Sequence, residues 1–155
     1  MARMPEKVAE FLSGRRYAVA GVSRQPKKAA NAIYRRLRAS GFEVLPVNPN
    51  AAEAEGARCY PDLVSIPEQI DGVVVVTRPD AALGIVRQCA DRGIKRVWLH
   101  RAFGTGSVSR EAVRECRAQG MLCLAGGCPM MYCEPVDAGH RCIRAWLRLL
   151  GRVPG

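Results

Sequence analysis

The chain has 155 residues, 48% of them apolar and 6% aromatic, and a formal net charge of +10 at pH 7. This length and composition predict one domain over residues 1–155 that buries enough surface to fold without disulfide or metal staples. No apolar run is long enough to span a bilayer, and the start of the chain lacks the pattern of a signal peptide. We therefore expect a cytoplasmic protein with no membrane partner.

The excess of basic residues favours a polyanionic partner, and both phosphorylated small molecules and nucleic acids fit that description. The arginines, however, are scattered through the predicted helices and are not grouped with aromatic residues. Modules dedicated to nucleic acids combine basic residues with aromatic stacking platforms. The composition therefore favours a small phosphorylated ligand over nucleic acid.

The predicted elements alternate between helices and strands along the chain. A leading helix carries Val8, Phe11 and Leu12 on one face, and a closing helix over about 137–150 carries an apolar face of Ile143, Trp146, Leu147 and Leu150. Between them we expect strands at 17–22, 43–47, 72–77, 95–99 and 121–125, a short additional strand at 57–59, and helices near 28–40, 80–92 and 108–119.

Two features indicate how these elements are arranged. Gly41, Gly93 and Gly120 each end an amphipathic segment just before an apolar run, as expected of a glycine that stops a helix and leads into a strand. The run at 73–76 is apolar without alternation, which is typical of a strand covered on both faces. We predict a single α/β domain of Rossmann-like, doubly wound type, with a mostly parallel sheet of five or six strands, helices on both faces, and a core over about 15–126.

The end of the first predicted strand resembles a phosphate-binding turn. Glycine lets backbone N–H groups approach an anion closely, and the N-terminus of the following helix adds the positive end of its dipole. A hydroxyl and several cations follow the glycine directly. The candidate ligands at this turn are Gly21, Val22, Ser23, Arg24 and Lys28.

The same turn argues against ordinary NAD binding. The dinucleotide fingerprint needs three glycines, but Ser23 and Pro26 hold the second and third positions. NAD-binding domains also place an acidic residue after the second strand to hold the ribose diol, and here that place is held by Asn48. An NAD(P)-dependent oxidoreductase cofactor domain is the alternative function, and these departures count against it. Such a domain would also lack a substrate domain in this chain.

The other strand ends supply further candidates, because ligands of open parallel sheets bind in a crevice at the carboxyl ends of the strands. These candidates are Val47, Asn48 and Pro49 after the second strand, Thr77, Arg78 and Pro79 after the third, His100 after the fourth and Cys128 after the fifth. No carboxylate or nucleophile is spaced to make His100 catalytic, and the cysteines are spaced too widely for a zinc site. We assign no catalytic residue and no metal, and we hypothesise that Cys128 meets the thiol of a bound ligand.

Several segments together resemble the stand-alone coenzyme A-binding domain proteins. These are Gly21-Val22-Ser23 with Pro26-Lys27-Lys28, the segments 42–49 and 56–63, Ile66-Pro67, and Val97-Trp98-Leu99, and the likeness extends from about Ala9 to Trp146. Such proteins are similar to the Rossmann-type domain of the succinyl-CoA synthetase α subunit. A departure is His100, where most family members carry glutamine.

The resemblance implies binding of coenzyme A or an acyl-CoA without catalysis, and a division of the candidates along the ligand. Gly21, Val22, Ser23 and Lys28 would meet the phosphates, Asn48 and Pro49 the adenosine, and Thr77, Arg78 and Pro79 the pantetheine. His100 and Cys128 would lie at the thiol end. The apolar faces of the terminal helices also leave a homodimer or an enzyme partner open.

Overall fold

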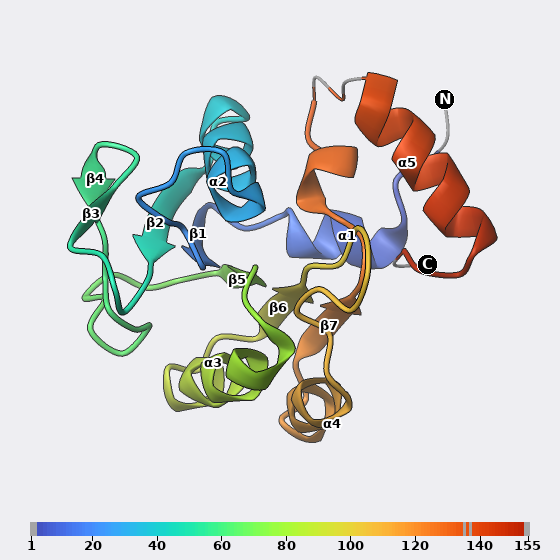
Figure 1. Ribbon diagram of the computed structural model, residues 1–155. Helices are drawn as coiled ribbons and strands as arrows, with labels where there is room; N and C mark the ends of the chain where they lie inside the picture. The colour runs from blue at the N-terminus through green and yellow to red at the C-terminus, as the bar shows by residue number, and fades with distance from the viewer. Residues whose placement is uncertain (1–2, 135, 137, 154–155) are drawn as a thin grey trace.

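The computed structural model describes residues 3–134, 136 and 138–153 (Figure 1). Along the chain the elements are α1 (Glu6–Phe11), β1 (Arg16–Ala20), α2 (Ala29–Ala39), β2 (Glu43–Val47), β3 (Glu53–Ala54), β4 (Ala57–Arg58), β5 (Gly72–Val75), α3 (Pro79–Asp91), β6 (Arg96–Leu99), α4 (Arg110–Ala118), β7 (Leu122–Ala125), the 3-10 helix η1 (Pro129–Met131) and α5 (Ala138–Leu149). No helix within these residues combines the length and the apolar character needed to cross a membrane.

Five strands form one parallel sheet in the order β2-β1-β5-β6-β7. Numbered among themselves, these strands run 2-1-3-4-5, one of the two common doubly wound orders, in which the order reverses between the first and third strands. Helices α1 and α2 pack on one face and α3 and α4 on the other, so each face has its own apolar core (Figure 1). This confirms the predicted Rossmann-like α/β fold.

The central strands are buried on both faces, as their composition predicts. All residues of β5, Gly72–Val75, are buried, and β1 and β6 each expose only their first residue in part. The observed strands match the predicted ranges, although the first and third end two residues earlier than predicted. The N–H groups of Gly21 and Val76, just after these strands, still donate to the last residues of the neighbouring strands, Val47 and Ala20, at 2.8 and 2.9 Å.

The glycines at the helix ends adopt the predicted conformation. Gly41 has a φ of 92°, and after it the N–H of Phe42 donates to the carbonyl of Leu37 at 3.2 Å. Gly93 and Gly120 have φ of 67° and 68°, and the residues after them make equivalent bonds. This pairing satisfies carbonyls that the last helical turn would otherwise leave without partners.

At the periphery, one prediction gains detail and another needs correction. The strand predicted at 57–59 exists as β4, and it pairs antiparallel with β3 in a separate hairpin whose turn residues, Glu55 and Gly56, both have positive φ. Of the predicted five or six strands, the main sheet therefore has five. On α5, only Leu147 of the predicted apolar face is fully buried, whereas Trp146 and Leu150 are exposed, because α5 contacts the rest of the molecule mainly through η1. The predicted first residue of that helix, at 137, lies outside the described residues.

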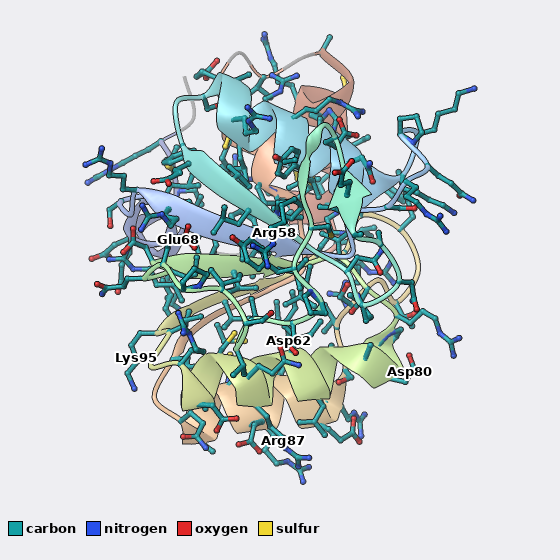
Figure 2. The ribbon with its side chains drawn as sticks, turned by 90° about the vertical axis from the view of Figure 1, so that its left-hand side faces the viewer. Arg58, Asp62, Glu68, Asp80, Arg87 and Lys95 are labelled. Atoms are coloured by element: carbon teal, nitrogen blue, oxygen red, sulfur yellow. The ribbon has the colours of Figure 1, made fainter. Side chains whose placement is uncertain are left out.

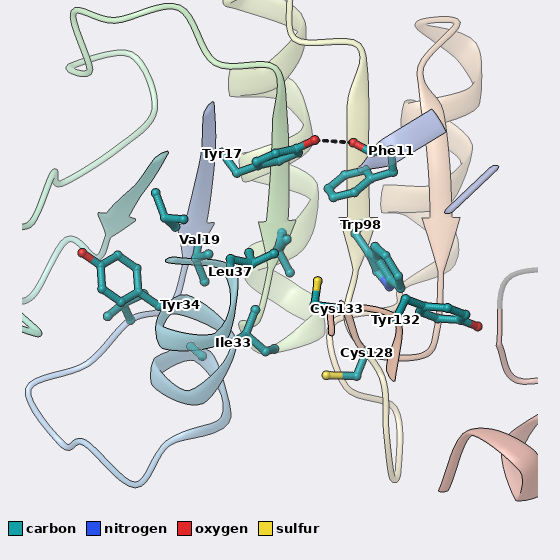
Figure 3. Packing of buried hydrophobic residues seen from close by; sticks show 14 of the residues in the cluster. Phe11, Tyr17, Val19, Ile33, Tyr34, Leu37, Trp98, Cys128, Tyr132 and Cys133 are labelled. Carbon is teal, nitrogen blue, oxygen red and sulfur yellow. Dashed lines mark hydrogen bonds between the residues drawn. The ribbon is translucent and has the colours of Figure 1, made fainter. Parts of the chain in front are cut away.

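An aromatic cluster fills the core on the α1 side (Figure 3). The ring of Trp98 in β6 meets Phe11 edge-on at 5.3 Å between centroids, and its indole N–H donates to the carbonyl of Gly126 at 2.9 Å. The hydroxyl of Tyr17 in β1 donates to the carbonyl of Phe11 at 2.6 Å. These contacts fix α1 against the sheet and align the ends of β6 and β7.

Candidate functional site

A cavity of about 590 Å³ opens at the carboxyl ends of β2, β1 and β5, on the side covered by α3; we call it the α3 cavity. Six of the predicted site residues line it, namely Gly21, Val47, Asn48, Pro49, Thr77 and Arg78. Figure 2 shows Asp80, another lining residue, at the end of α3 nearest this edge, whereas Lys95 lies at the opposite edge of the sheet. The cavity has the size of a typical small-ligand site, at the place where the strand order reverses.

Helix α3 forms a wall of the cavity that the sequence analysis missed. Ala81, Gly84, Ile85 and Gln88 line it at helical spacings of three and four residues. Alanine at 81 and glycine at 84 leave the space open, and the Gln88 carboxamide oxygen accepts the N–H of Leu63 at 2.9 Å, which holds the loop after β4. A stripe containing alanine and glycine on a helix that faces a strand end is the signal that could have revealed this wall.

Replacement of Gly84 by alanine is expected to stabilise the fold. Gly84 lies inside α3 with ordinary helical φ, and a Cβ there meets nothing within 4 Å. Alanine in a helix interior is favoured over glycine by about 0.5–1 kcal/mol, mainly because glycine loses more backbone entropy on folding. Urea denaturation of Gly84→Ala should show this increase in unfolding free energy, and a decrease would mean that the cavity wall cannot accept a methyl group.

The turn after β1 is held close to its neighbouring strands. Gly21 has a φ of 106°, and a Cβ there would lie 2.1 Å from the carbonyl oxygen of Val76, so only glycine fits. Its own N–H donates to the carbonyl of Val47 at 2.8 Å. Glycine is required here because the turn packs closely against the end of β5. The N–H of Gly21 already donates a hydrogen bond to β2 within the protein.

Asn31 fixes the rest of this turn and was also missed from the sequence. It is a fully buried polar residue in the first turn of α2. Its Oδ1 accepts the N–H of Ser23 at 2.9 Å, and its Nδ2 donates to the carbonyl of Ser23 and to a carboxylate oxygen of Glu55, both at 2.7 Å. The side chain therefore ties the turn, α2 and the β3–β4 hairpin together, while the Ser23 hydroxyl accepts the N–H of Gln25 at 3.1 Å.

Asn48 bridges the ends of the first two strands. Its Nδ2 donates to the carbonyl of Val22 at 2.8 Å, and its Oδ1 accepts the N–H of Asn50 at the same distance. One amide hydrogen of Nδ2 is left over after these bonds, since the group carries two donors. Asn48 lines the α3 cavity as predicted, but much of its hydrogen-bonding capacity goes to shaping the cavity wall.

The end of β5 is fixed by Ser107, another fully buried polar residue that the sequence analysis missed. Its hydroxyl accepts the N–H of Thr77 at 2.8 Å and donates to the Thr77 carbonyl at 2.7 Å. Pro79 then starts α3 at its first position, where a proline loses no helical hydrogen bond. Thr77 and Arg78 are thereby presented to the cavity, and Pro79 itself does not line it.

The predicted cations lie outside the α3 cavity, apart from Arg78, which pairs with Asp80 at 2.8 Å. Arg24 and Lys28 are exposed on the segment that leads from Gly21 to α2, and Lys28 is the N-cap of that helix without a side-chain cap bond. Val22 is buried within the core on the α2 side. The turn, these cations and the N-terminus of α2 thus form the rim beside the cavity.

His100 and Cys128 line a different cavity, of about 270 Å³, on the other face of the sheet; we call it the α2 cavity. Figure 3 shows Cys128 with its sulfur turned toward Ile33 of α2. The expectation of one crevice shared by all strand ends thus needs correction, because the loops after β6 and β7 turn to the α2 side. Burial, with a smaller contribution from nearby His140, lowers the pKa of His100 to about 4.

The pKa of His100 predicts a loss of stability in mild acid. The unfolded chain binds a proton at this group below about pH 6.5, whereas the folded chain does so only below about pH 4, so unfolding becomes easier as the pH falls between these values. The full effect is about 3 kcal/mol. Urea denaturation at pH 7.5, 6 and 5 should show this decline for the natural chain and a flatter profile for His100→Phe; identical profiles would contradict it.

Comparisons with known proteins agree with this architecture. The α subunit of the ADP-forming acetate–CoA ligase II of Pyrococcus furiosus is 30% identical over 106 residues, which are 68% of this chain and 23% of the subunit. The protein YneT of Bacillus subtilis, which is described as uncharacterized, is 26% identical over 79% of this chain and 88% of its own length. The chain thus spans less than a quarter of the ligase subunit but most of the small protein.

The solved structures that resemble this chain also include both a protein of similar length and a much longer synthetase. A hypothetical protein from Pyrococcus horikoshii OT3 is 26% identical, with a TM-score of 0.74 over 97% of this chain and 99% of its own. The dinucleotide-forming acetyl-coenzyme A synthetase 1 of Ca. Korarchaeum cryptofilum, solved with phosphate and ADP, is 30% identical, with a TM-score of 0.61 over 74% of this chain and 25% of its own. The family described as CoA binding domain matches residues 15–134, most of the chain, and the chain therefore belongs to that family.

Proposed function

We propose that the protein binds coenzyme A or an acyl-CoA at the carboxyl edge of the sheet, without catalysing a reaction of its own. The observation that carries the proposal is the α3 cavity, which lies at the switch point of a CoA binding domain fold and is bordered by Asn48, Thr77 and Arg78. Ligands of open α/β sheets bind at this position. The cavity accepts the adenosine portion, with its base against Asn48 and Pro49.

The phosphates belong at the rim between Gly21 and α2 in this proposal. Lys28 and Arg24 are exposed there, and the N-terminus of α2, an eleven-residue helix, has no acidic residue in its first turn. Cations and helix N-terminal N–H groups both stabilise phosphate. The Ser23 hydroxyl can donate its hydrogen to the same phosphates, since its oxygen only accepts within the protein.

The same geometry disfavours the NAD(P) alternative. Nicotinamide dinucleotide domains hold the ribose diol with a carboxylate at the end of the second strand, and Asn48 stands there. The carboxylates that do line the α3 cavity are engaged elsewhere: Asp80 pairs with Arg78, and Asp62 accepts the N–H of Ser65 at 2.7 Å. A nucleotide with additional phosphate, and not a dinucleotide, is the better complement to this edge.

Calorimetric titration of the full chain with coenzyme A, NAD and NADP tests the proposal. Coenzyme A should bind, and the nicotinamide cofactors should bind more weakly or not at all. Lys28→Ala should weaken coenzyme A binding by about five- to tenfold, as expected for loss of one charge-assisted phosphate contact, and Ser23→Ala should weaken it less. A preference for NADP with no response to coenzyme A would reverse the proposal.

Lys95→Ala is the matched control for Lys28→Ala. Lys95 is exposed like Lys28, but it precedes β6 and lies at the opposite edge of the sheet (Figure 2). Both substitutions lower the net charge equally, so a general electrostatic effect would weaken binding to the same degree in both. Binding that falls in Lys28→Ala and is unchanged in Lys95→Ala assigns the effect to a contact at the rim.

The module could act alone or beside an enzyme. The named ligase and synthetase relatives are several times longer than this chain, so an enzyme partner that receives the bound acyl-CoA is part of the proposal. A homodimer through α5 is the other arrangement, because Trp146 and Leu149 of that helix are exposed. Light scattering of the purified chain, alone and with coenzyme A, distinguishes a dimer from a monomer.

A further inference from the structure

The α2 cavity has a composition different from that of the α3 cavity. Its walls are Ala29 and Ile33 from α2, Met130 and Met131 from η1, and Ile143 from α5. No lysine, arginine, aspartate or glutamate lines it. Methionine side chains adapt to irregular apolar shapes, so this lining suits a small, flexible, uncharged group.

The polar side of the α2 cavity is formed by imidazoles. His100 lies at the end of β6 and His140 on α5. At neutral pH His100 carries no charge, because burial keeps its pKa near 4. A neutral imidazole has one N–H donor, which can bond a carbonyl oxygen within an otherwise apolar space.

The two cavities lie on opposite faces of the sheet, at the same edge, and the rim lies between them. Gly21 lines the α3 cavity and Ala29, the first residue of α2, lines the α2 cavity, so the rim with Lys28 separates them. Strands β1, β5 and β6 are neighbours, and strands in a sheet are spaced about 5 Å apart, so the end of β6 lies about 10 Å across from the end of β1. A long ligand with its phosphates on the rim can therefore occupy both cavities at once.

Other occupants fit less well. A second nucleotide needs more space, because small-ligand sites usually measure about 300–1,000 Å³, and the lining offers no cation for phosphate. A metal ion is also disfavoured, since within the described residues no group of three or more histidine, cysteine or acidic side chains is arranged to hold one. What the lining matches is an apolar chain that carries one hydrogen-bond acceptor.

We infer that the α2 cavity binds the acyl group of a short-chain acyl-CoA, with the thioester carbonyl accepting a hydrogen bond from His100. The inference rests on the proposed function and specifies its ligand class. At roughly 30 Å³ for a water-sized group, the cavity holds fewer than about nine such groups, which favours acyl chains of about two to six carbons. Each buried methylene should tighten binding by about fourfold.

The test compares coenzyme A, acetyl-CoA, butyryl-CoA and palmitoyl-CoA by calorimetry. Butyryl-CoA should bind about tenfold or more tightly than acetyl-CoA, from two additional methylenes, and palmitoyl-CoA should gain nothing beyond that. Ala32→Phe fills the cavity from α2 and should abolish the preference for butyryl-CoA while coenzyme A binding changes less than about twofold. Ala39→Phe, at the exposed last residue of the same helix, is the matched control and should keep the preference.

A thioether analogue isolates the carbonyl. S-butyl-CoA has the apolar chain of butyryl-CoA without the carbonyl oxygen, so it should bind the natural chain about three- to tenfold more weakly than butyryl-CoA. In His100→Phe this difference should disappear, because neither ligand then has an imidazole donor to bond. A difference that persists in His100→Phe would overturn the role given to His100.

The outcomes separate this inference from the proposed function. If coenzyme A binds but butyryl-CoA binds no more tightly, or if the preference survives Ala32→Phe in a folded variant, the acyl site is wrong and the proposed function stands. If neither coenzyme A nor any acyl-CoA binds to the folded natural chain, both are wrong. Far-UV circular dichroism of each variant verifies that the fold is kept.

Discussion

Gly21→Ala is expected to lose at least about 3 kcal/mol of unfolding free energy. The new Cβ would lie 2.1 Å from the carbonyl oxygen of Val76, which is backbone and cannot move aside cheaply. The φ of 106° adds a conformational cost of about 1–3 kcal/mol for any residue other than glycine. Relief of the clash would also pull the turn away from Val47, whose carbonyl accepts the N–H of Gly21.

Gly41→Ala is the control that isolates the clash. Gly41 has a similar φ of 92°, but a Cβ there meets nothing within 4 Å. This variant should therefore lose only the conformational part, about 1–2 kcal/mol. Equal losses in the two variants, measured by urea denaturation, would show that contact with Val76 does not constrain the turn.

Trp98→Ala is expected to destabilise the fold by about 3–5 kcal/mol, the range for removing a large buried aromatic side chain. Trp98 has no exposed surface, and its ring contacts those of Phe11 and Tyr132 (Figure 3). Its removal would leave a void between α1, β6 and η1 and would leave the carbonyl of Gly126 without its indole donor. Thermal and urea denaturation should both report the loss.

Two further substitutions separate the contributions of the hydrogen bond and of burial to the stability lost in Trp98→Ala. Trp98→Phe keeps most of the ring volume but loses the hydrogen bond, so it should cost less than Trp98→Ala, about 1–3 kcal/mol. Trp146→Ala removes the same side chain from a position that is 51% exposed and should cost under about 1 kcal/mol. If Trp98→Ala were as mild as Trp146→Ala, the aromatic cluster would not contribute as described.

The regular elements could be predicted because their signals are local. The uninterrupted apolar run at 73–76 identifies a central strand, and Gly41, Gly93 and Gly120 identify helix ends, since each effect depends on a few neighbouring residues. A two-residue strand carries too little apolar pattern to indicate its partner, so the sequence left open whether the strand at 57–59 was a sixth strand of the main sheet, and it is paired with β3 in a hairpin. Similarly, the apolar face of α5 does not reveal how little of it is covered.

The candidate site was predictable in position but not in detail. The rule that ligands bind at the carboxyl ends of strands led to six residues that line the α3 cavity. The contributions of Asn31 and Ser107 could not be found in this way, because each acts through hydrogen bonds to a loop that lies 8 or 30 residues away in the sequence. The division into two cavities also escaped prediction, since it depends on which face the loops after β6 and β7 turn toward.

The most direct test of ligand binding at the carboxyl edge is a ¹H–¹⁵N correlation NMR titration of the full chain with coenzyme A. The largest changes in amide chemical shift should fall at the rim and the α3 cavity, at Gly21, Asn48, Thr77 and Ala29. Changes concentrated at the opposite edge of the sheet, around Arg15 and Asp71, or no changes at saturating coenzyme A, would contradict it.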